Sequence, residues 1–248
     1  MIRSGIKRVI NSTSVTLHVL ATIVNSRTRQ NLWIGDSHAL FISGSRRATV
    51  AATPNHEDIC IWLGPRLAFS VARDGWRLPA RVRLIARIRR FNKLIIVMGE
   101  IDCRVYLGRP NDTDYRQEAW VREFVEVAYS LADQLRVKEL VFLSPVPPAD
   151  IGKNDADFPR NGSLTARVQG TKWFTDIVTS LSSSRLFGDV IDLRHLVGNE
   201  DGSLDLNFTT DGVHVNRKGS LLIQEAIRDR EVVAKTQRPI PSHHQDGA

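Results

Sequence analysis

The segment Leu32–His38 constrains the fold of this chain more than any other, because a short apolar run ends abruptly in Gly35, Asp36 and Ser37. Such a run followed by Gly and small polar residues is typical of the carboxyl end of a buried strand in a parallel sheet. Open α/β sheets place their ligands at that edge. A serine held there can act as a nucleophile if a base lies within reach.

Strand-like and helix-like segments alternate along the chain. The unbroken apolar run at residues 94–98 is expected of a strand that is covered on both faces. The alternation favours a parallel sheet with helices on both sides. We therefore expect the α/β class, with a three-layer α/β/α sandwich around a flavodoxin-like parallel sheet of about five strands. Strands are predicted at 32–36, 49–52, 59–63, 94–98, 139–143 and 190–193. Helices are predicted at 117–137, 163–182 and 216–230, and the stretch 67–90 is expected to be mostly helical but broken near Gly75 and Pro79.

Two of these helices have apolar residues at helical spacing, which predicts the face that each turns toward the core. In the helix at 117–137 the predicted inward residues are Trp120, Phe124, Ala128, Leu131 and Leu135. In the helix at 163–182 they are Leu164, Val168, Phe174, Ile177 and Leu181.

A candidate base lies far downstream, where Asp211 and His214 are three residues apart. One tight turn can bring both side chains to the same side. The carboxylate can then fix the tautomer of the imidazole, which can accept the serine proton. His38 is the rival base, but neighbouring side chains diverge in most backbones, so we expect it to line the site or to pack locally. His195 is expected to be structural.

Four short blocks resemble those of the SGNH hydrolases, also called the GDSL esterase and lipase family. The blocks stand in the family's order across residues 32–216: they are Gly35-Asp36-Ser37, Gly64, Gly99-Glu100-Ile101-Asp102, and Asp211 with His214. Gly-Asp-Ser alone would be a weak signal, whereas the ordered set is much more specific.

The resemblance implies a serine esterase that uses no metal and no organic cofactor. Ser37 would be the nucleophile, His214 the base and Asp211 the carboxylate that orients it. The backbone N–H of Gly64, together with that of Ser37, would face the oxyanion. Gly99 would lie beside this oxyanion and substrate site.

The third block departs from the family pattern. Asp102 closes this block and is predicted to belong to the oxyanion or substrate-binding region. Relatives have an asparagine that donates a side-chain N–H to the oxyanion, and here that position is Ile101, which has no donor. Loss of one such donor typically lowers the rate about a hundred- to a thousandfold.

The expected substrate is an acylated small molecule or polysaccharide, most simply an O-acetyl group on a carbohydrate. The family acts on acetyl esters of carbohydrates, on lipids and on thioesters. The stretch 144–162 is polar and proline-rich, which does not suit a lipid-sized apolar lid, and it can form one wall of the site. Two alternatives remain: a carbohydrate O-acyltransferase on the same triad, and a non-catalytic glycan-binding relative.

A metal-dependent phosphoesterase is a further alternative, because Asp36-Ser37-His38 also fits an Asp-x-His pattern. That class has a Gly-Asn-His block as well, which this sequence lacks. No metal ligand is therefore assigned.

The net charge and hydropathy of the sequence limit the classes of binding partner that we expect. The formal net charge is +7, and much of it comes from a basic segment that begins at Arg73 and ends at Lys93. We interpret this segment as a solvated helix face, with attraction to an acidic glycan or an anionic membrane surface as the alternative. It contains no recognisable nucleic-acid-binding motif, so no nucleic-acid partner is expected. No apolar run approaches the roughly 18 residues of a membrane span, so no integral membrane segment is expected.

The sequence predicts three regions. These are a peripheral segment at 1–30, one SGNH-like hydrolase domain at 31–235, and a disordered tail at 236–248. Cys60 and Cys103 are expected to be free, buried thiols, which fits a cytoplasmic location. Secretion stays open because the amino terminus is basic, and the oligomeric state is also open.

Overall fold

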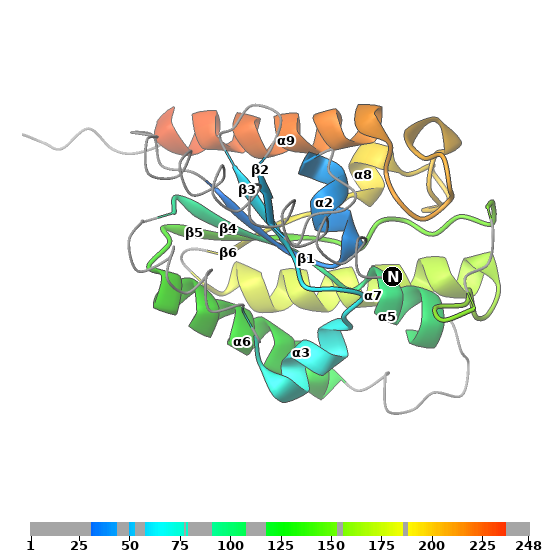
Figure 1. The fold of residues 1–248 in the computed structure, drawn as a ribbon, viewed down its shortest axis with the longest axis horizontal. Coiled ribbons are helices and arrows are strands. Elements are labelled where there is room, and N and C mark those ends of the chain that lie inside the picture. The colour runs from blue at the N-terminus through cyan, green and yellow to red at the C-terminus, as the bar shows by residue number, and fades with distance from the viewer. Residues whose placement is uncertain are drawn as a thin grey trace, which may run out of the picture.

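The structure is a computed structural model. It describes residues 31–43, 50–52, 58–76, 78, 91–107, 118–152, 156–185 and 188–236. Within these ranges, six strands form one sheet (Figure 1). They are β1 (Leu32–Gly35), β2 (Val50–Ala52), β3 (Ile59–Trp62), β4 (Lys93–Val97), β5 (Glu139–Leu143) and β6 (Gly188–Ile191).

The strands lie in the order β2-β3-β1-β4-β5-β6. All neighbours from β3 to β6 pair in parallel, and β2 pairs antiparallel with β3 at the edge. Without β2, the order of the parallel strands is that of the flavodoxin-like sheet, in which the second strand lies outside the first. Their carboxyl ends therefore meet at one edge, where such sheets bind ligands.

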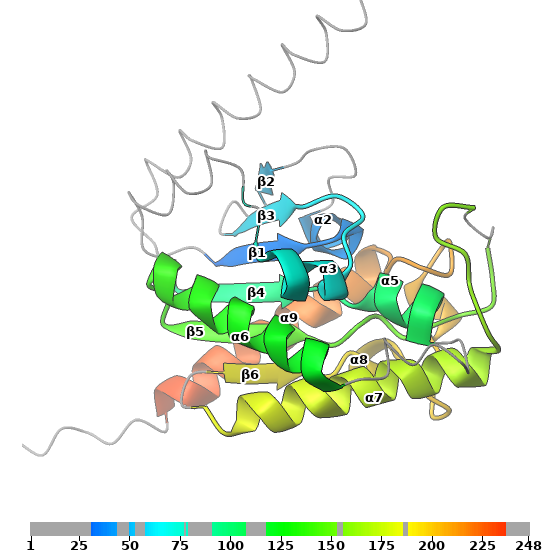
Figure 2. The same ribbon diagram turned by 90° about the horizontal axis from the view of Figure 1, so that it is seen from below.

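Helices cover both faces of the sheet. The face above the sheet in Figure 1 carries α2 (Ser37–Ser43), α8 (Arg194–Val197) and α9 (Arg217–Thr236). The other face carries α3 (Ala68–Asp74), α6 (Glu118–Leu135) and α7 (Leu164–Ser183), which cross in front of the strands in Figure 2. The short helix α5 (Glu100–Asp102) follows β4 and continues as a π-helical turn over Cys103–Leu107.

Each face of the sheet has its own hydrophobic core. Side chains alternate between the two faces along a strand, so Leu32 and Ile34 join the core under α3, α6 and α7. Trp33, between them, joins the core under α2, α8 and α9. All of these side chains are almost completely buried. β1 is packed between the two cores, and it ends with Gly35 at the carboxyl edge of the sheet, where the next residues follow.

The predicted three-layer fold and its parallel sheet are confirmed. Two details of the predictions are wrong. The last strand begins at Gly188 and ends at Ile191, two residues earlier than predicted. Lys93 does not belong to an exposed helix face, because it begins β4, is buried and pairs with Glu139 at 2.8 Å. Cys60 and Cys103 are free and buried, as predicted.

Two predictions concern residues outside the described ranges. They are the peripheral segment at 1–30 and the interpretation of residues 79–90 of the basic segment. The domain boundaries at 30 and 236 stay predictions, although α9 itself runs to Thr236. In the part of the chain that the structure describes, no helix is long and apolar enough to cross a membrane.

Candidate active site

Ser37 is carried to the carboxyl edge of the sheet by a close approach of two strands. Gly35 lies against β4, and a Cβ at this position would be only 1.9 Å from the carbonyl oxygen of Val97. The next residue, Asp36, donates its backbone N–H to the same carbonyl at 3.2 Å. The chain then turns at once into α2, so Ser37 is the first residue of a helix at the end of a central strand.

His214 lies on a loop that is closed by a bridge between Thr209 and Val215. The hydroxyl of Thr209 accepts the N–H of Gly212 at 2.9 Å and donates to the carbonyl of His214 at 2.8 Å. Asp211 accepts the backbone N–H groups of Val213 and His214 at 2.9 and 2.8 Å. These bonds fix the loop from inside and hold the Asp211 carboxylate beside the His214 ring.

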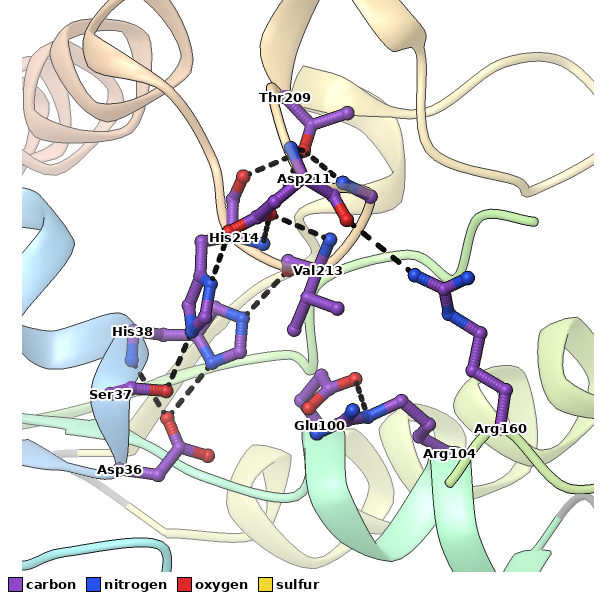
Figure 3. Close-up of polar contacts among 11 residues, drawn as sticks. Asp36, Ser37, His38, Glu100, Arg104, Arg160, Thr209, Asp211, Val213 and His214 are labelled. Atoms are coloured by element: carbon purple, nitrogen blue, oxygen red, sulfur yellow. Dashed lines mark hydrogen bonds and ion pairs between the residues drawn. The ribbon is translucent and has the colours of Figure 1, made fainter. Parts of the chain in front are cut away.

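The structure brings Ser37, His214 and Asp211 into one hydrogen-bonded chain (Figure 3). The Ser37 Oγ lies 2.8 Å from His214 Nε2, and His214 Nδ1 lies 2.8 Å from Asp211 Oδ2. A carboxylate only accepts hydrogen bonds, so Nδ1 carries the proton and Nε2 is left to accept the serine proton. Phe41 stacks on the His214 ring with centroids 3.9 Å apart and planes at 8°.

The electrostatics keep Asp211 ionised and His214 neutral. Burial raises the pKa of Asp211, but hydrogen bonds from the ring and backbone of His214 and from Val213 outweigh it and hold that pKa well below its usual range. Burial is also the largest influence on His214 and lowers its pKa. Asp211 opposes this effect and the nearby His38 adds to it, so the pKa of His214 is lowered overall. A neutral imidazole can act as a general base.

Ser37 and His214 open onto a cavity of about 660 Å³, within the size range of small-molecule sites. Gly152 and Phe158 in its wall come from the proline-rich stretch 144–162, as predicted. The cavity is lined by Ser37, Trp62, Pro65, Ile101, Arg104, Gly152, Phe158, Thr210, Asp211, Val213 and His214.

Two backbone N–H groups lie beside this cavity. Ser37 is at the start of a helix, where the first N–H groups lack intrahelical partners. Gly64, between the lining residues Trp62 and Pro65, has a φ of 86°, which glycine adopts readily. Neither N–H is bonded to another of the described residues. Ile101 is buried, lines the cavity and contributes no donor.

The other two predicted site residues have structural positions. Gly99 has a left-handed backbone at the start of α5, and a Cβ there would come within 2.9 Å of the Phe174 ring. Asp102 is completely buried, and its carboxylate accepts the backbone N–H groups of Ala68 and Phe69 at 2.8 and 3.1 Å. Burial raises the pKa of Asp102 to about 7, although these two bonds oppose the shift. We therefore correct its predicted substrate-binding role to a cap of helix α3.

His38 lies beside the triad but is fully engaged elsewhere. Its Nδ1 is 2.9 Å from Asp36 Oδ1, and its Nε2 is 2.9 Å from the carbonyl oxygen of Val213. Burial, the largest influence, lowers the pKa of His38, but the charge and hydrogen bond of Asp36 more than offset it, and the pKa rises to about 9. Both Asp36 and His38 are thus bonded within the protein. Nowhere in the described ranges do three or more His, Cys, Asp or Glu residues gather in a way that could hold a metal ion. His195, which we expected to be structural, is exposed on α8, and its Nε2 lies 3.7 Å from Asp192 Oδ2.

Two arginines that are not among the predicted site residues brace the site. The guanidinium of Arg160 donates to the carbonyl oxygens of Gly152 and Asp211, which joins a cavity wall to the His214 loop (Figure 3). Arg104 lines the cavity, pairs with Glu100 at 2.8 Å and donates to the carbonyl of Phe158. The i,i+4 spacing of Glu100 and Arg104 is a signal for the pair. Nothing in the local sequence signals the role of Arg160.

Comparison with solved structures shows where this fold occurs elsewhere. A GDSL-like lipase from Bacteroides thetaiotaomicron is 12% identical with a TM-score of 0.57, and the match covers 89% of this chain and 98% of that one. A carbohydrate acetylesterase from Sinorhizobium meliloti is 15% identical with a TM-score of 0.51, covering 84% and 100%. A catalytic mutant of an acetylxylan esterase from Geobacillus stearothermophilus is 14% identical with a TM-score of 0.50, covering 81% and 93%.

A scan against protein-family models and a search of curated proteins found no match to the sequence. The structural similarity extends over almost the whole length of the solved chains, at identities that sequence comparison does not detect. The chain therefore has the three-layer fold of the GDSL-type lipases and acetylesterases.

Proposed function

We propose that this protein is a serine ester hydrolase of the GDSL type that removes a small acyl group, with an O-acetylated carbohydrate as its substrate. The observation that carries the proposal is the hydrogen-bonded chain from Ser37 through His214 to Asp211, with 2.8 Å at each step. All three residues line a cavity of about 660 Å³, at the edge of the sheet where α/β folds bind ligands.

The reaction follows from this geometry. The Ser37 Oγ attacks the ester carbonyl while His214 Nε2 takes its proton, and Asp211 stabilises the imidazolium that forms. The N–H groups of Ser37 and Gly64 receive the oxyanion. When the tetrahedral intermediate collapses, His214 returns the proton to the leaving alcohol and an acyl-Ser37 ester remains. A water molecule activated by His214 then releases the acid and restores the serine hydroxyl.

The cavity wall supports a carbohydrate substrate. Trp62 and Phe158 offer aromatic surfaces, which can pack on the C–H face of a sugar, and Arg104 and Thr210 offer hydrogen-bonding groups. Two of the structures with this fold are described as a carbohydrate acetylesterase and an acetylxylan esterase. Ile101 adds an apolar surface, which suits a small acyl group better than a charged one.

Labelling with a fluorophosphonate probe tests the proposal without knowledge of the substrate. We expect the purified protein to be labelled, and Ser37→Ala to remove all labelling while the thermal melting curve stays unchanged. Ser180→Ala, which alters an exposed serine on α7, is the matched control and should be labelled like the wild type. A folded wild-type protein that the probe does not label would refute the proposal.

The substrate class requires a second measurement. Acetate release from O-acetylated xylo-oligosaccharides is expected to exceed release of longer acids from octanoyl esters. Repeating the assay with a free sugar in excess separates hydrolysis from transfer, because an acyltransferase would form a new sugar ester in place of free acetate. Preference for long acyl chains would refute the proposed substrate and leave the triad intact.

A further inference from the structure

Helix α2 contacts the His214 loop at three points, and only one of them is the nucleophile. Ser37 bonds to the His214 ring, Phe41 stacks on that ring, and His38 bonds to the carbonyl of Val213, the residue before His214. Figure 3 shows the His38 ring between Asp36 and this carbonyl. His38 and the loop residue that it binds are 175 positions apart in the chain.

The contacts of His38 determine its protonation. A backbone carbonyl oxygen only accepts hydrogen bonds, so the Nε2 that lies 2.9 Å from Val213 carries a proton. The carboxylate oxygen that lies 2.9 Å from Nδ1 is also an acceptor, so Nδ1 carries a proton as well. The ring is therefore an imidazolium, buried with Asp36 as its counter-ion. Such a ring has no lone pair to offer as a base.

We propose that His38 is a positioning residue, whose buried imidazolium ties the His214 loop to the end of β1 and disfavours protonation of His214. This inference rests on the proposed function, since it assigns His38 a part in the same reaction. The ring centroids of His38 and His214 are 4.9 Å apart. At that distance a positive charge opposes a second positive charge on His214. The raised pKa of His38 agrees with this assignment.

The other charged groups around His214 are accounted for. On its own loop Asp211 favours the protonated form, and from α5 the carboxylate of Glu100 acts in the same direction. From α2, His38 acts in the opposite direction. Arg160 donates to the carbonyl oxygen of Asp211 on this loop. Of Asp211, Glu100 and His38, only His38 lowers the pKa of His214, and it also holds the loop in place.

Two variants separate the effect of the hydrogen bond between His38 and Val213 from the effect of the positive charge on His38. His38→Gln removes the imidazolium charge and replaces the rigid ring with a flexible amide. Asp36→Asn removes the counter-ion, so the buried ring becomes neutral but can keep its Nε2–H bond to Val213. His195→Gln changes an exposed histidine on α8 and is the matched control.

The experiment is histidine ring NMR on the full chain, together with kcat/KM for p-nitrophenyl acetate, both followed against pH. In the wild type at pH 7 we expect protons on both nitrogens of His38 and a neutral His214. In His38→Gln the His214 midpoint should rise by about half a unit to one unit, since a nearby positive charge is gone. In Asp36→Asn the rise should be smaller, because a positive and a negative charge are lost together. The acid limb of kcat/KM should move to higher pH by the same amount. At high pH, His38→Gln should lose about tenfold in rate, whereas Asp36→Asn should retain most of it.

A neutral His38 ring at pH 7 in the wild type would overturn the inference. So would folded variants whose His214 midpoint equals that of the wild type. If His38→Gln does not fold, the spectra of the wild type and of Asp36→Asn decide. Failure of the proposed function is distinguished by the wild type itself, which would then neither hydrolyse the ester nor react with the fluorophosphonate, while the NMR measurement would still give the state of His38.

Discussion

The carboxyl edge of the sheet holds two aspartate–histidine pairs, and they differ in what the far ring nitrogen meets. In the Asp36–His38 pair both side chains are almost completely buried, and the far nitrogen faces a backbone carbonyl. In the Asp211–His214 pair the side chains are 45% and 21% exposed, and the far nitrogen faces the hydroxyl of Ser37. A carbonyl can only accept a hydrogen bond, whereas a hydroxyl can donate one.

This difference teaches that an adjacent carboxylate does not by itself make a histidine a general base. The carboxylate sets a proton on the near nitrogen in both pairs. The partner of the far nitrogen then decides between a buried cation, as in His38, and a neutral proton acceptor, as in His214. The four predictions that follow test this distinction, from the largest expected effect to the smallest.

Substitution of the two histidines gives the strongest contrast. His214→Ala removes the proton acceptor of Ser37, and we expect kcat/KM on p-nitrophenyl acetate to fall by at least about ten-thousandfold, as for other triads. His38→Gln should lose only about tenfold, because it removes a positioning residue. Steady-state kinetics at pH 8 measures both. A severe loss in His38→Gln beside an active His214→Ala would mean that the base has been assigned to the wrong histidine.

Substitution of the two aspartates tests the same contrast between the pairs. Asp211→Asn leaves an amide beside His214 Nδ1, which no longer selects the productive tautomer, and we expect a loss of about a thousandfold in kcat. Asp36→Asn should lose less than about tenfold, because the ring of His38 does not exchange a proton with the substrate. Equal losses in the two variants would contradict the assignment of separate roles. Melting temperatures serve as the control for folding.

Substitution of Ile101 tests whether the rate is limited by stabilisation of the oxyanion or by the Asp211–His214 pair. Ile101→Asn places a side-chain donor where relatives have one, and we expect kcat to rise by up to about a hundredfold. Ile101→Leu is the matched control, since it keeps the volume and adds no donor. A wild type whose rate falls on Ile101→Asn would indicate that another group already fills this role. In that case Arg104, which also lines the cavity, is the first residue to substitute.

The two pairs should respond differently to alkaline pH. The pKa of His38 is raised to about 9 in the folded protein, and the unfolded value is about 6.5. The folded state therefore binds the extra proton more tightly, so this stabilisation is complete below about pH 6.5 and is lost as pH rises through 9. Its size is on the order of 3 kcal/mol. The pKa of Asp211 is depressed, so its contribution is lost only toward acid pH.

Urea unfolding at pH 6.5, 8 and 9.5 measures this alkaline loss. The wild type and His195→Gln should lose stability across the series, and His38→Gln should show a much flatter dependence because the titrating group is gone. Parallel curves for the wild type and His38→Gln would show that His38 is not the titrating group.

Much of the fold could be predicted from the sequence because its signals are local and apolar. The inward face of α6 was predicted from Trp120, Phe124 and the residues in step with them, and all five predicted side chains are buried. The inward face of α7 was predicted only in part: Phe174 is buried and Ile177 and Leu181 pack half-buried against the core, but the other buried residues of this helix were not predicted. Its buried face includes Arg167, which pairs with Asp150, and Thr175, whose hydroxyl donates to the backbone carbonyl of Thr171 one turn earlier. Polar side chains can be buried when a partner satisfies them, and apolar periodicity does not reveal such partners.

The residues of the candidate site also divide into those with a local sequence signal and those without one. Ser37 could be predicted because a glycine and small polar residues end an apolar strand, and Asp211 with His214 could be predicted from their spacing. Asp102 could not, because its position at the end of a strand fits a ligand contact as well as a cap for α3. Arg160 could not be predicted either, since it acts through backbone carbonyls that any residue supplies.

The sequence by itself predicted the layered sheet, Ser37 as the candidate nucleophile and Asp211 with His214 as its candidate partners, since each signal comes from residues close together in the chain. Only the tertiary structure showed that Asp36 and His38 form a second pair, and what the far nitrogen of each histidine meets. The far nitrogen of His214 meets a serine 177 positions away, and the far nitrogen of His38 meets a carbonyl 175 positions away. The folded sheet edge brings these partners together. The physical reason is that the proton acceptor is defined by the second ring nitrogen, whose environment local sequence does not contain.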